Sequence, residues 1–218
     1  MKNRFAKMAA VAMAAIALFT GCGIKYNATL VTITNDGEMD KISLGYGNFV
    51  ARYTQALYDS YYGSILSDGF WDTDMYGNGN TMEADTKDSV MDEMKTAYLC
   101  KVHAAEYGVE LTDDQTKAID AAAKKFMEEN DEKAISELGA KEDYVRDYLT
   151  YRTYYVMVKE KVDAEAPADF ASEDGTTYFD SKKAEWEAAT TWTVDEKQWE
   201  KVSFDNKFVV KSEESSEE

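Results

Sequence analysis

The residues with the clearest chemical potential are Cys100 and His103, which stand three positions apart in a helical pattern. Residues at this spacing share a helix face, so the imidazole could act as a base for the thiol. An activated thiol also needs a third group that orients the base, and the sequence offers none. A cysteine beside Leu99 and Val102 is typical of a small buried hydrophobic residue. We therefore expect Cys100 to be structural rather than catalytic.

A second candidate for chemistry is a loop with the spacing of an EF-hand calcium site. Its carboxylates fall at the first, third and twelfth positions and glycine at the sixth, and the candidate oxygen ligands are Asp72, Asp74, Asn78, Asn80 and Glu83. Two positions depart from the pattern, because Tyr76 lacks a carboxylate or amide oxygen and Gly79 replaces an apolar anchor. The alternative, which the sequence favours, is a polar loop that ends at a helix cap near Thr81.

Other catalytic constellations are missing from the sequence. It has no glycine-rich phosphate loop, no metal-spaced His/Cys cluster and no Gly-x-Ser-x-Gly motif. Acidic pairs such as Asp113-Asp114 are typical of solvated helix faces in so acidic a chain. We expect neither catalysis nor a cofactor.

The first 22 residues have the pattern of an export signal. A positively charged start precedes an apolar run over residues 8–19, which is too short to span a membrane comfortably, and residues 19–22 read Phe-Thr-Gly-Cys. This ending resembles the lipobox of bacterial lipoproteins, although Phe19 stands where leucine is usual. The resemblance implies a signal peptide over residues 1–21, a lipid on Cys22 and extracytoplasmic anchoring to a bacterial membrane. The alternative is an ordinary secretory signal followed by an incidental cysteine.

Charge and composition exclude one class of partner. The chain carries a net charge of −18, and loss of the signal would remove three further cations. Such a surface repels phosphate backbones, so we expect no nucleic-acid partner. At 44% hydrophobic and 13% aromatic residues, the chain has enough apolar material for a real core.

Hydrophobic periodicity predicts a mainly helical chain with little β-structure. Alternation predicts a strand over 29–34, and the Asn-Asp-Gly sequence after it predicts a turn. Helical spacing begins at Ile42 and recurs around residues 90–105, 112–127, 132–138, 141–162, 182–189 and 194–201. A capping box at Thr112 and Gln115 opens the third of these helices. A second strand over 204–210 is expected to pair with residues 29–34.

These elements divide the chain into six predicted segments. They are the signal peptide 1–21, the lipidated N-terminus and short strand 22–41, a helical domain 42–163, a polar linker 164–180, a helix and strand 181–210 that pack back on the domain, and a disordered acidic tail 211–218.

Two stretches carry a family resemblance. They are residues 105–115, Ala-Glu-Tyr-Gly-Val-Glu-Leu-Thr-Asp-Asp-Gln, and residues 138–149, Leu-Gly-Ala-Lys-Glu-Asp-Tyr-Val-Arg-Asp-Tyr-Leu, before a long helix. With the strand, turn and helix before them, they resemble the N-terminal chaperone domain of SurA/PrsA-type extracytoplasmic foldases, which is similar to the substrate-holding arms of trigger factor. The resemblance covers residues 28–163. It implies a helical chaperone domain of about four to six helices, with a short β pairing between N- and C-terminal strands.

The sequence departs from that family where its enzyme would stand. Such foldases usually insert parvulin prolyl-isomerase domains of roughly 90 residues, a compact-domain size, after the long helix. Here only a short polar segment follows Val162, and the paired histidines of a parvulin site are missing. The resemblance therefore implies a chaperone that binds unfolded or nascent exported polypeptides without catalysis. Two alternatives remain: a degenerate peptidyl-prolyl isomerase, and an adaptor lipoprotein that docks one partner. A homodimer is compatible with each.

Tyrosine is the residue type most suited to such binding. It gives a large amphipathic contact at low entropic cost. In the pairs Tyr61-Tyr62 and Tyr154-Tyr155, neighbouring side chains point about 100° apart on a helix, so both members cannot lie on one narrow buried stripe. We expect client contacts at Tyr58, Tyr62, Tyr151 and Tyr154, against the alternative that the tyrosines form the core.

Overall fold

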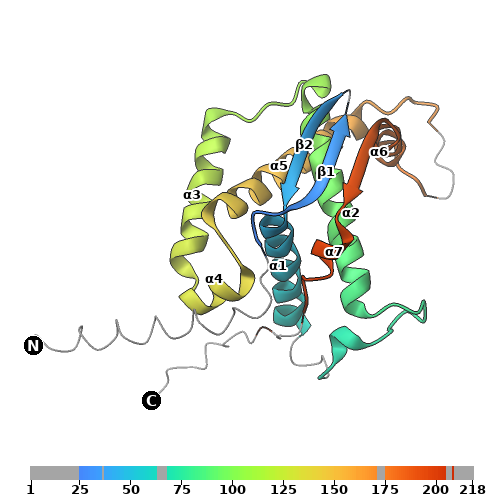
Figure 1. Ribbon diagram of the computed structural model, residues 1–218. Coiled ribbons are helices and arrows are strands. Elements are labelled where there is room, and N and C mark those ends of the chain that lie inside the picture. Colours follow the sequence, from blue (N-terminus) through green and yellow to red (C-terminus); the bar gives the residue numbers. More distant parts are fainter. Residues whose placement is uncertain (1–24, 36, 63–67, 171–174, 205–207, 209–218) are drawn as a thin grey trace, which may run out of the picture.

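The computed structural model describes residues 25–35, 37–62, 68–170, 175–204 and 208 of the 218-residue chain (Figure 1). Within these ranges the chain forms seven α-helices, two 3-10 helices and a small antiparallel sheet. The expected mainly helical fold is confirmed. No helix in the described ranges is long and apolar enough to cross a membrane.

The sheet has three strands, β1 (Thr29–Asn35), β2 (Glu38–Ser43) and β3 (Thr190–Val194), in the order β2-β1-β3. Both pairings are antiparallel, and Ile33 lies opposite Asp40 on one side and Trp192 on the other. The strand β1 is therefore central, and its buried residues Leu30, Val31 and Ile33 belong to the core.

Three predictions of secondary structure need correction. The C-terminal partner of β1 is Thr190–Val194, whereas Phe204 and Phe208, the described residues of the predicted strand 204–210, are in no strand. A Thr-Thr-Trp-Thr-Val run has high β propensity, which explains its pairing. The predicted helix 194–201 is reduced to α7 (Glu196–Trp199). The helix predicted from Ile42 begins two residues later, at Leu44, because residues 38–43 form β2, which pairs with β1 across the turn at Gly37 (φ +82°).

The other helices have the expected order. They are α1 (Leu44–Tyr62), α2 (Met82–His103), α3 (Asp113–Glu129), α4 (Glu132–Leu138), α5 (Glu142–Ala164) and α6 (Tyr178–Ala189), with 3-10 turns at Phe70–Asp72 and Ala104–Tyr107. The capping box of α3 is confirmed, because the Thr112 side chain accepts from the Gln115 backbone N–H and the Gln115 side chain accepts in return. Gly139 ends α4 with φ +62°, as its position predicted.

The helices surround the sheet in an open arrangement. The long helices α2 and α5 pack against each other, and α5 also packs against α3. In Figure 1, α3 and α4 lie to the left of the sheet, and α6 lies to its right, next to the edge strand β3. The helix α1 runs from the end of β2 and contacts α2, α4 and α5, so its first half lies in the core.

Aromatic rings fill the space between α1 and α5. The Tyr53 ring lies 5.5 Å from Tyr148 and 5.9 Å from Phe126 of α3, and Phe49 meets both of these rings edge-on. Edge-to-face contacts of this kind stabilise a core beyond the area they bury. They fix the first half of α1 and thereby determine where its second half points.

Candidate functional site

The burial pattern of α1 inverts along its length. In the first half, Phe49 and Val50 are buried in the ordinary way. From Arg52 to the end of the helix, the buried side chains are polar: Arg52, Gln55 and Asp59 are only 6%, 0% and 3% exposed. Four large apolar side chains of this part face outward, with Leu57 43%, Tyr58 37%, Tyr61 83% and Tyr62 46% exposed. An inversion of this kind marks a surface that folding alone does not require.

Each buried polar group of this half-helix has a partner. The Arg52 guanidinium donates to the Ser203 carbonyl at 2.9 Å and to the Gln55 side chain. The Gln55 amide donates to the Phe204 carbonyl at 3.2 Å. The Asp59 carboxylate accepts from the Phe208 backbone N–H at 2.8 Å. Residues 203, 204 and 208, from the C-terminal part of the same chain, therefore each supply a partner to this polar face.

The outward face continues into a group of touching aromatic rings, here named the end cluster. Ring centroids are 6.3 Å apart for Tyr61 and Tyr62, 6.1 Å for Tyr62 and Tyr58, and 5.8 Å for Tyr58 and Trp71. Trp71 in turn lies 4.9 Å from Phe204. The exposed fraction of the side chains rises from 2% at Phe204 to 83% at Tyr61, so the end cluster is buried at Phe204 and exposed to solvent at Tyr61.

The four tyrosines predicted to bind clients do not form one surface. Tyr58 and Tyr62 belong to the end cluster. Tyr151 lies on α5, where its ring packs 6.0 Å from Tyr46 at the start of α1. Because Tyr46 and Tyr62 are separated by about 24 Å of helix, the two regions are distinct. Tyr154 is half-buried and packs against the core.

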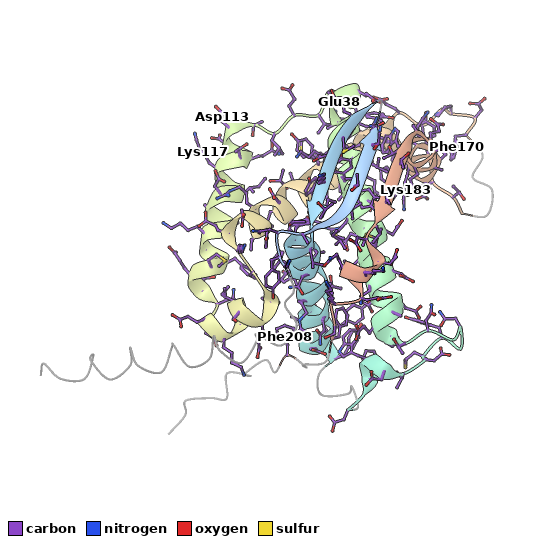
Figure 2. All side chains as sticks on the ribbon, viewed as in Figure 1. Glu38, Asp113, Lys117, Phe170, Lys183 and Phe208 are labelled. Carbon is purple, nitrogen blue, oxygen red and sulfur yellow. The ribbon has the colours of Figure 1, made fainter. Side chains whose placement is uncertain are left out.

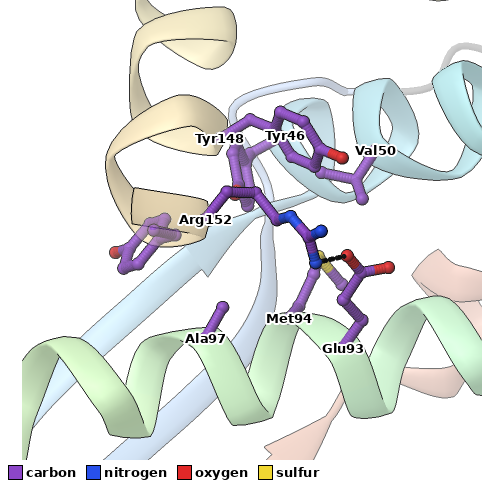
Figure 3. Close-up of a pocket in the computed structure, with 8 residues that line it drawn as sticks. Tyr46, Val50, Glu93, Met94, Ala97, Tyr148 and Arg152 are labelled. Atoms are coloured by element: carbon purple, nitrogen blue, oxygen red, sulfur yellow. Dashed lines mark hydrogen bonds and ion pairs between the residues drawn. The ribbon is translucent and has the colours of Figure 1, made fainter. Parts of the chain in front are cut away.

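Tyr151 lies beside a small pocket between α1, α2 and α5 (Figure 3). The pocket holds about 10 Å³, room for roughly one water molecule. Figure 3 shows Arg152 of α5 reaching across it to Glu93 of α2, to which it donates at 2.8 Å. Burial raises the pKa of Tyr148 to about 12 and also raises that of Tyr151. Neutral phenols in so small a space belong to the packing between helices rather than to a ligand site.

The calcium candidates point to separate partners. The Asp74 carboxylate accepts from the backbone N–H groups of Asn78 and Gly79, at 3.1 and 2.9 Å. Glu83 turns away from the loop, and its carboxylate accepts from the Phe204 backbone N–H at 3.1 Å. The loop is therefore closed by hydrogen bonds to its own backbone.

The remaining candidate calcium ligands also do not converge on a common point. The side-chain amides of Asn78 and Asn80 donate to the Asp85 carboxylate, and Asp72 lies in the 3-10 turn. Among the residues that the structure describes, no three His, Cys, Asp or Glu side chains are grouped to hold a metal ion. The loop ends where Thr81 caps α2, since its hydroxyl accepts from the Ala84 N–H at 3.2 Å.

Cys100 and His103 are not arranged as a catalytic pair. Cys100 is fully buried, and burial raises its pKa to about 12, so the thiol stays neutral. The His103 ring stacks on Trp186 of α6 at 4.7 Å, and its Nδ1 lies 2.6 Å from the Glu106 carboxylate. The His103 ring joins α2 to α6, and Cys100 is part of the core.

Sequence reasoning missed Arg52, Gln55 and Asp59. A signal was present, because polar residues at i, i+3 and i+7 share one helix face. Leu57 and Tyr61, which continue the helical spacing that begins at Ile42, are both exposed. Trp71 and Phe204 carried no local signal, since their partners are distant in the sequence.

Residues 1–24, which include the predicted signal peptide and Cys22, lie outside the described residues, so lipidation of Cys22 stays a prediction.

Comparison of the chain with protein-family models, characterised proteins and solved structures gave no match in any of the three.

Proposed function

We propose that this protein is a chaperone that binds unfolded or extended polypeptides through the end cluster, without catalysis. The observation that carries the proposal is the inversion of α1, in which Tyr58, Tyr61 and Tyr62 face outward while Arg52 and Asp59 are buried. A monomeric protein gains no stability from exposing three adjacent tyrosines. A binding surface does use them, because tyrosine and tryptophan are the residues enriched at interface hot spots.

The chemistry of the end cluster suits a partner without a fixed shape. Phenol rings offer flat apolar faces and hydroxyl groups that can donate or accept hydrogen bonds, and each ring costs little entropy to order. The exposed Met75 lies in the loop that follows Trp71, and methionine adapts to different neighbours. Such a surface favours apolar side chains of an extended chain over one complementary shape.

Net charge supports the same proposal. A protein that exposes apolar rings risks self-association, and a charge of −18 opposes it by mutual repulsion. The proposed location is extracytoplasmic, with the chain held to the membrane by a lipid on Cys22. A tethered chaperone in that location would meet exported polypeptides as they emerge unfolded.

Aggregation of a denatured model client, followed by light scattering, tests the proposal. The soluble chain from Gly23 onward should suppress scattering at near-stoichiometric ratio, and Tyr61→Ser/Tyr62→Ser should lose most of that suppression. The matched control is Tyr76→Ser, an exposed tyrosine 69% accessible outside the end cluster, which should behave as wild type.

The outcomes separate the proposal from its alternatives. No suppression at several-fold molar excess would contradict a general chaperone and favour an adaptor with one partner. Faster refolding of a proline-limited client at catalytic amounts would instead indicate an isomerase, because proline isomerisation is slow enough to limit folding. If the Tyr76→Ser control lost suppression of aggregation to the same extent, client binding could not be assigned to the end cluster.

A further inference from the structure

Residues 202–204 and 208 are held to α1 and α2 through their main chain. Five side chains, here named the main-chain clamp, make the contacts; they are Arg52, Gln55 and Asp59 of α1 with Glu83 and Lys87 of α2. The Lys87 ammonium donates to the Val202 carbonyl at 2.6 Å. The Glu83 carboxylate accepts from the Phe204 N–H, and the Gln55 amide donates to the Phe204 carbonyl.

The clamp contacts main-chain groups at four described positions. Besides Val202 and Phe204, Arg52 donates to the Ser203 carbonyl and Asp59 accepts from the Phe208 N–H. Each of these partners is either a backbone carbonyl, which every residue has, or a backbone N–H, which every residue except proline has. Contacts of this kind give affinity with little dependence on sequence, as when an extended peptide adds to a sheet edge.

Two aromatic side chains, four positions apart, anchor the bound segment. Phe204 is 2% exposed and packs against Trp71 at 4.9 Å between ring centroids. The Arg52 guanidinium lies 4.7 Å from the centroid of Phe208, a cation–π contact. Figure 2 shows Phe208 at the far end of α1. The clamp thus binds backbone groups, while Trp71 and the Arg52 guanidinium contact the aromatic side chains of Phe204 and Phe208.

The clamp and the end cluster are continuous. Trp71 packs against Phe204 on one side and Tyr58 on the other, and its indole N–H donates to Asp59 of the clamp at 3.2 Å. A polypeptide that entered the clamp would therefore run directly onto the exposed tyrosines. The clamp holds two cations and two carboxylates, so it carries no net charge and favours neither positively nor negatively charged peptides.

We infer that the main-chain clamp is a binding site for an extended polypeptide with aromatic residues four positions apart, and that residues 202–204 and 208 occupy it in place of a client. This inference rests on the proposed function and specifies its ligand. Residues 202–204 and 208 then compete with clients, and weakening their anchor strengthens client binding.

A labelled peptide with the sequence of residues 202–210, Val-Ser-Phe-Asp-Asn-Lys-Phe-Val-Val, is the probe. Its binding to the soluble mature chain and to Phe208→Ala is measured by fluorescence anisotropy. Phe208→Ala should bind the peptide at least fivefold more tightly, because its own segment has lost an anchor. The control Phe170→Ala removes a ring that packs on Tyr178, well away from Phe208 in Figure 2, and should bind as wild type.

A second probe leaves the protein unaltered. The same peptide, N-methylated at the Phe208 amide, cannot donate to Asp59 and should bind at least tenfold more weakly than the unmethylated peptide. Equal affinities for the two peptides, or equal affinities of wild type and Phe208→Ala, would overturn the inference. If Phe208→Ala loses its native circular dichroism, the two peptides compared on wild type decide alone, and equal or undetectable binding overturns it.

The client assay on the same proteins separates this inference from the proposed function. If the protein suppresses client aggregation but neither Phe208→Ala nor N-methylation changes peptide affinity, the proposed chaperone function stands and the clamp as a binding site is overturned. If the peptide affinities change as predicted but client aggregation is not suppressed, the clamp stands as a binding site and the chaperone function is contradicted.

Discussion

Asp59 and Trp71 are joined by a hydrogen bond from the indole N–H to the carboxylate, 3.2 Å long, and both side chains are buried. The bond ties the 3-10 turn Phe70–Asp72 to the second half of α1. Because the Asp59 carboxylate also accepts from the Phe208 N–H, one side chain holds a loop and the C-terminal residues together. The geometry of the end cluster depends on this carboxylate.

Asp59→Ala should therefore destabilise the fold. The substitution leaves the buried indole N–H and the Phe208 N–H without their acceptor, and each unsatisfied buried donor costs about 1–3 kcal/mol. We expect the free energy of unfolding, measured by urea titration, to fall by about 2 kcal/mol or more. The control Asp88→Ala, on the exposed face of α2, should change it by less than about 0.5 kcal/mol. Equal effects of the two would show that the Asp59 contacts contribute nothing.

Gly47→Ala should destabilise the protein although alanine is the better helix former. A Cβ at this position would lie 2.3 Å from Cδ2 of the fully buried Leu30. Overpacking of this kind costs about 1–3 kcal/mol, more than the roughly 1 kcal/mol gained in helix propensity. In a Leu30→Ala background the clash is gone, and the same change should be neutral or stabilising. A Gly47→Ala variant with a raised melting temperature would contradict the close packing of α1 on β1.

Tyr151 and Tyr62 should respond differently to truncation. Tyr151 packs against Tyr46 and Tyr98 and lies 4.9 Å from the Lys101 ammonium, so Tyr151→Ala should cost about 2 kcal/mol of stability or more. Tyr62 is 46% exposed, and Tyr62→Ala should cost less than about 1 kcal/mol while weakening client binding. A Tyr151→Ala variant that keeps full stability but loses client binding would contradict this assignment and show that Tyr151 of α5 contacts clients.

Stability should decline at alkaline pH. Burial raises the pKa values of Tyr98, Cys100 and Tyr148 to about 12, from 10.0 for tyrosine and 9.0 for cysteine. Since the unfolded chain ionises first, the stabilisation is complete below about pH 9 and is lost as the pH rises toward 12. Urea midpoints should fall steadily between pH 9 and pH 12. A constant midpoint across this range would show that these groups are accessible to solvent.

Much of the fold could be predicted from local sequence signals. Thr112 with Gln115 and the glycine at position 139 marked helix ends correctly, because capping depends on a few neighbouring residues. Strand pairing was harder. The partner of β1 was expected at 204–210 and lies at Thr190–Val194, since both stretches are rich in β-formers and only long-range packing selects between them.

The candidate site was predictable only in part. Tyr58 and Tyr62 stood out by composition and spacing, and both lie in the end cluster. The buried polar face of Arg52, Gln55 and Asp59 was hidden, because its partners come from residues about 150 positions later in the chain. Sequence periodicity reports which face of a helix is apolar, and it fails where a distant segment satisfies a polar face instead.

Site-specific photo-crosslinking to an unfolded client tests the central claim most directly. A photoreactive phenylalanine analogue replaces Tyr62 in one variant, Tyr154 in a second and the exposed Tyr76 in a third, each mixed with the same labelled client. The end-cluster account predicts strong crosslinks from position 62 and background levels from positions 154 and 76. Equal crosslinking at all three positions, or none at position 62, would contradict it.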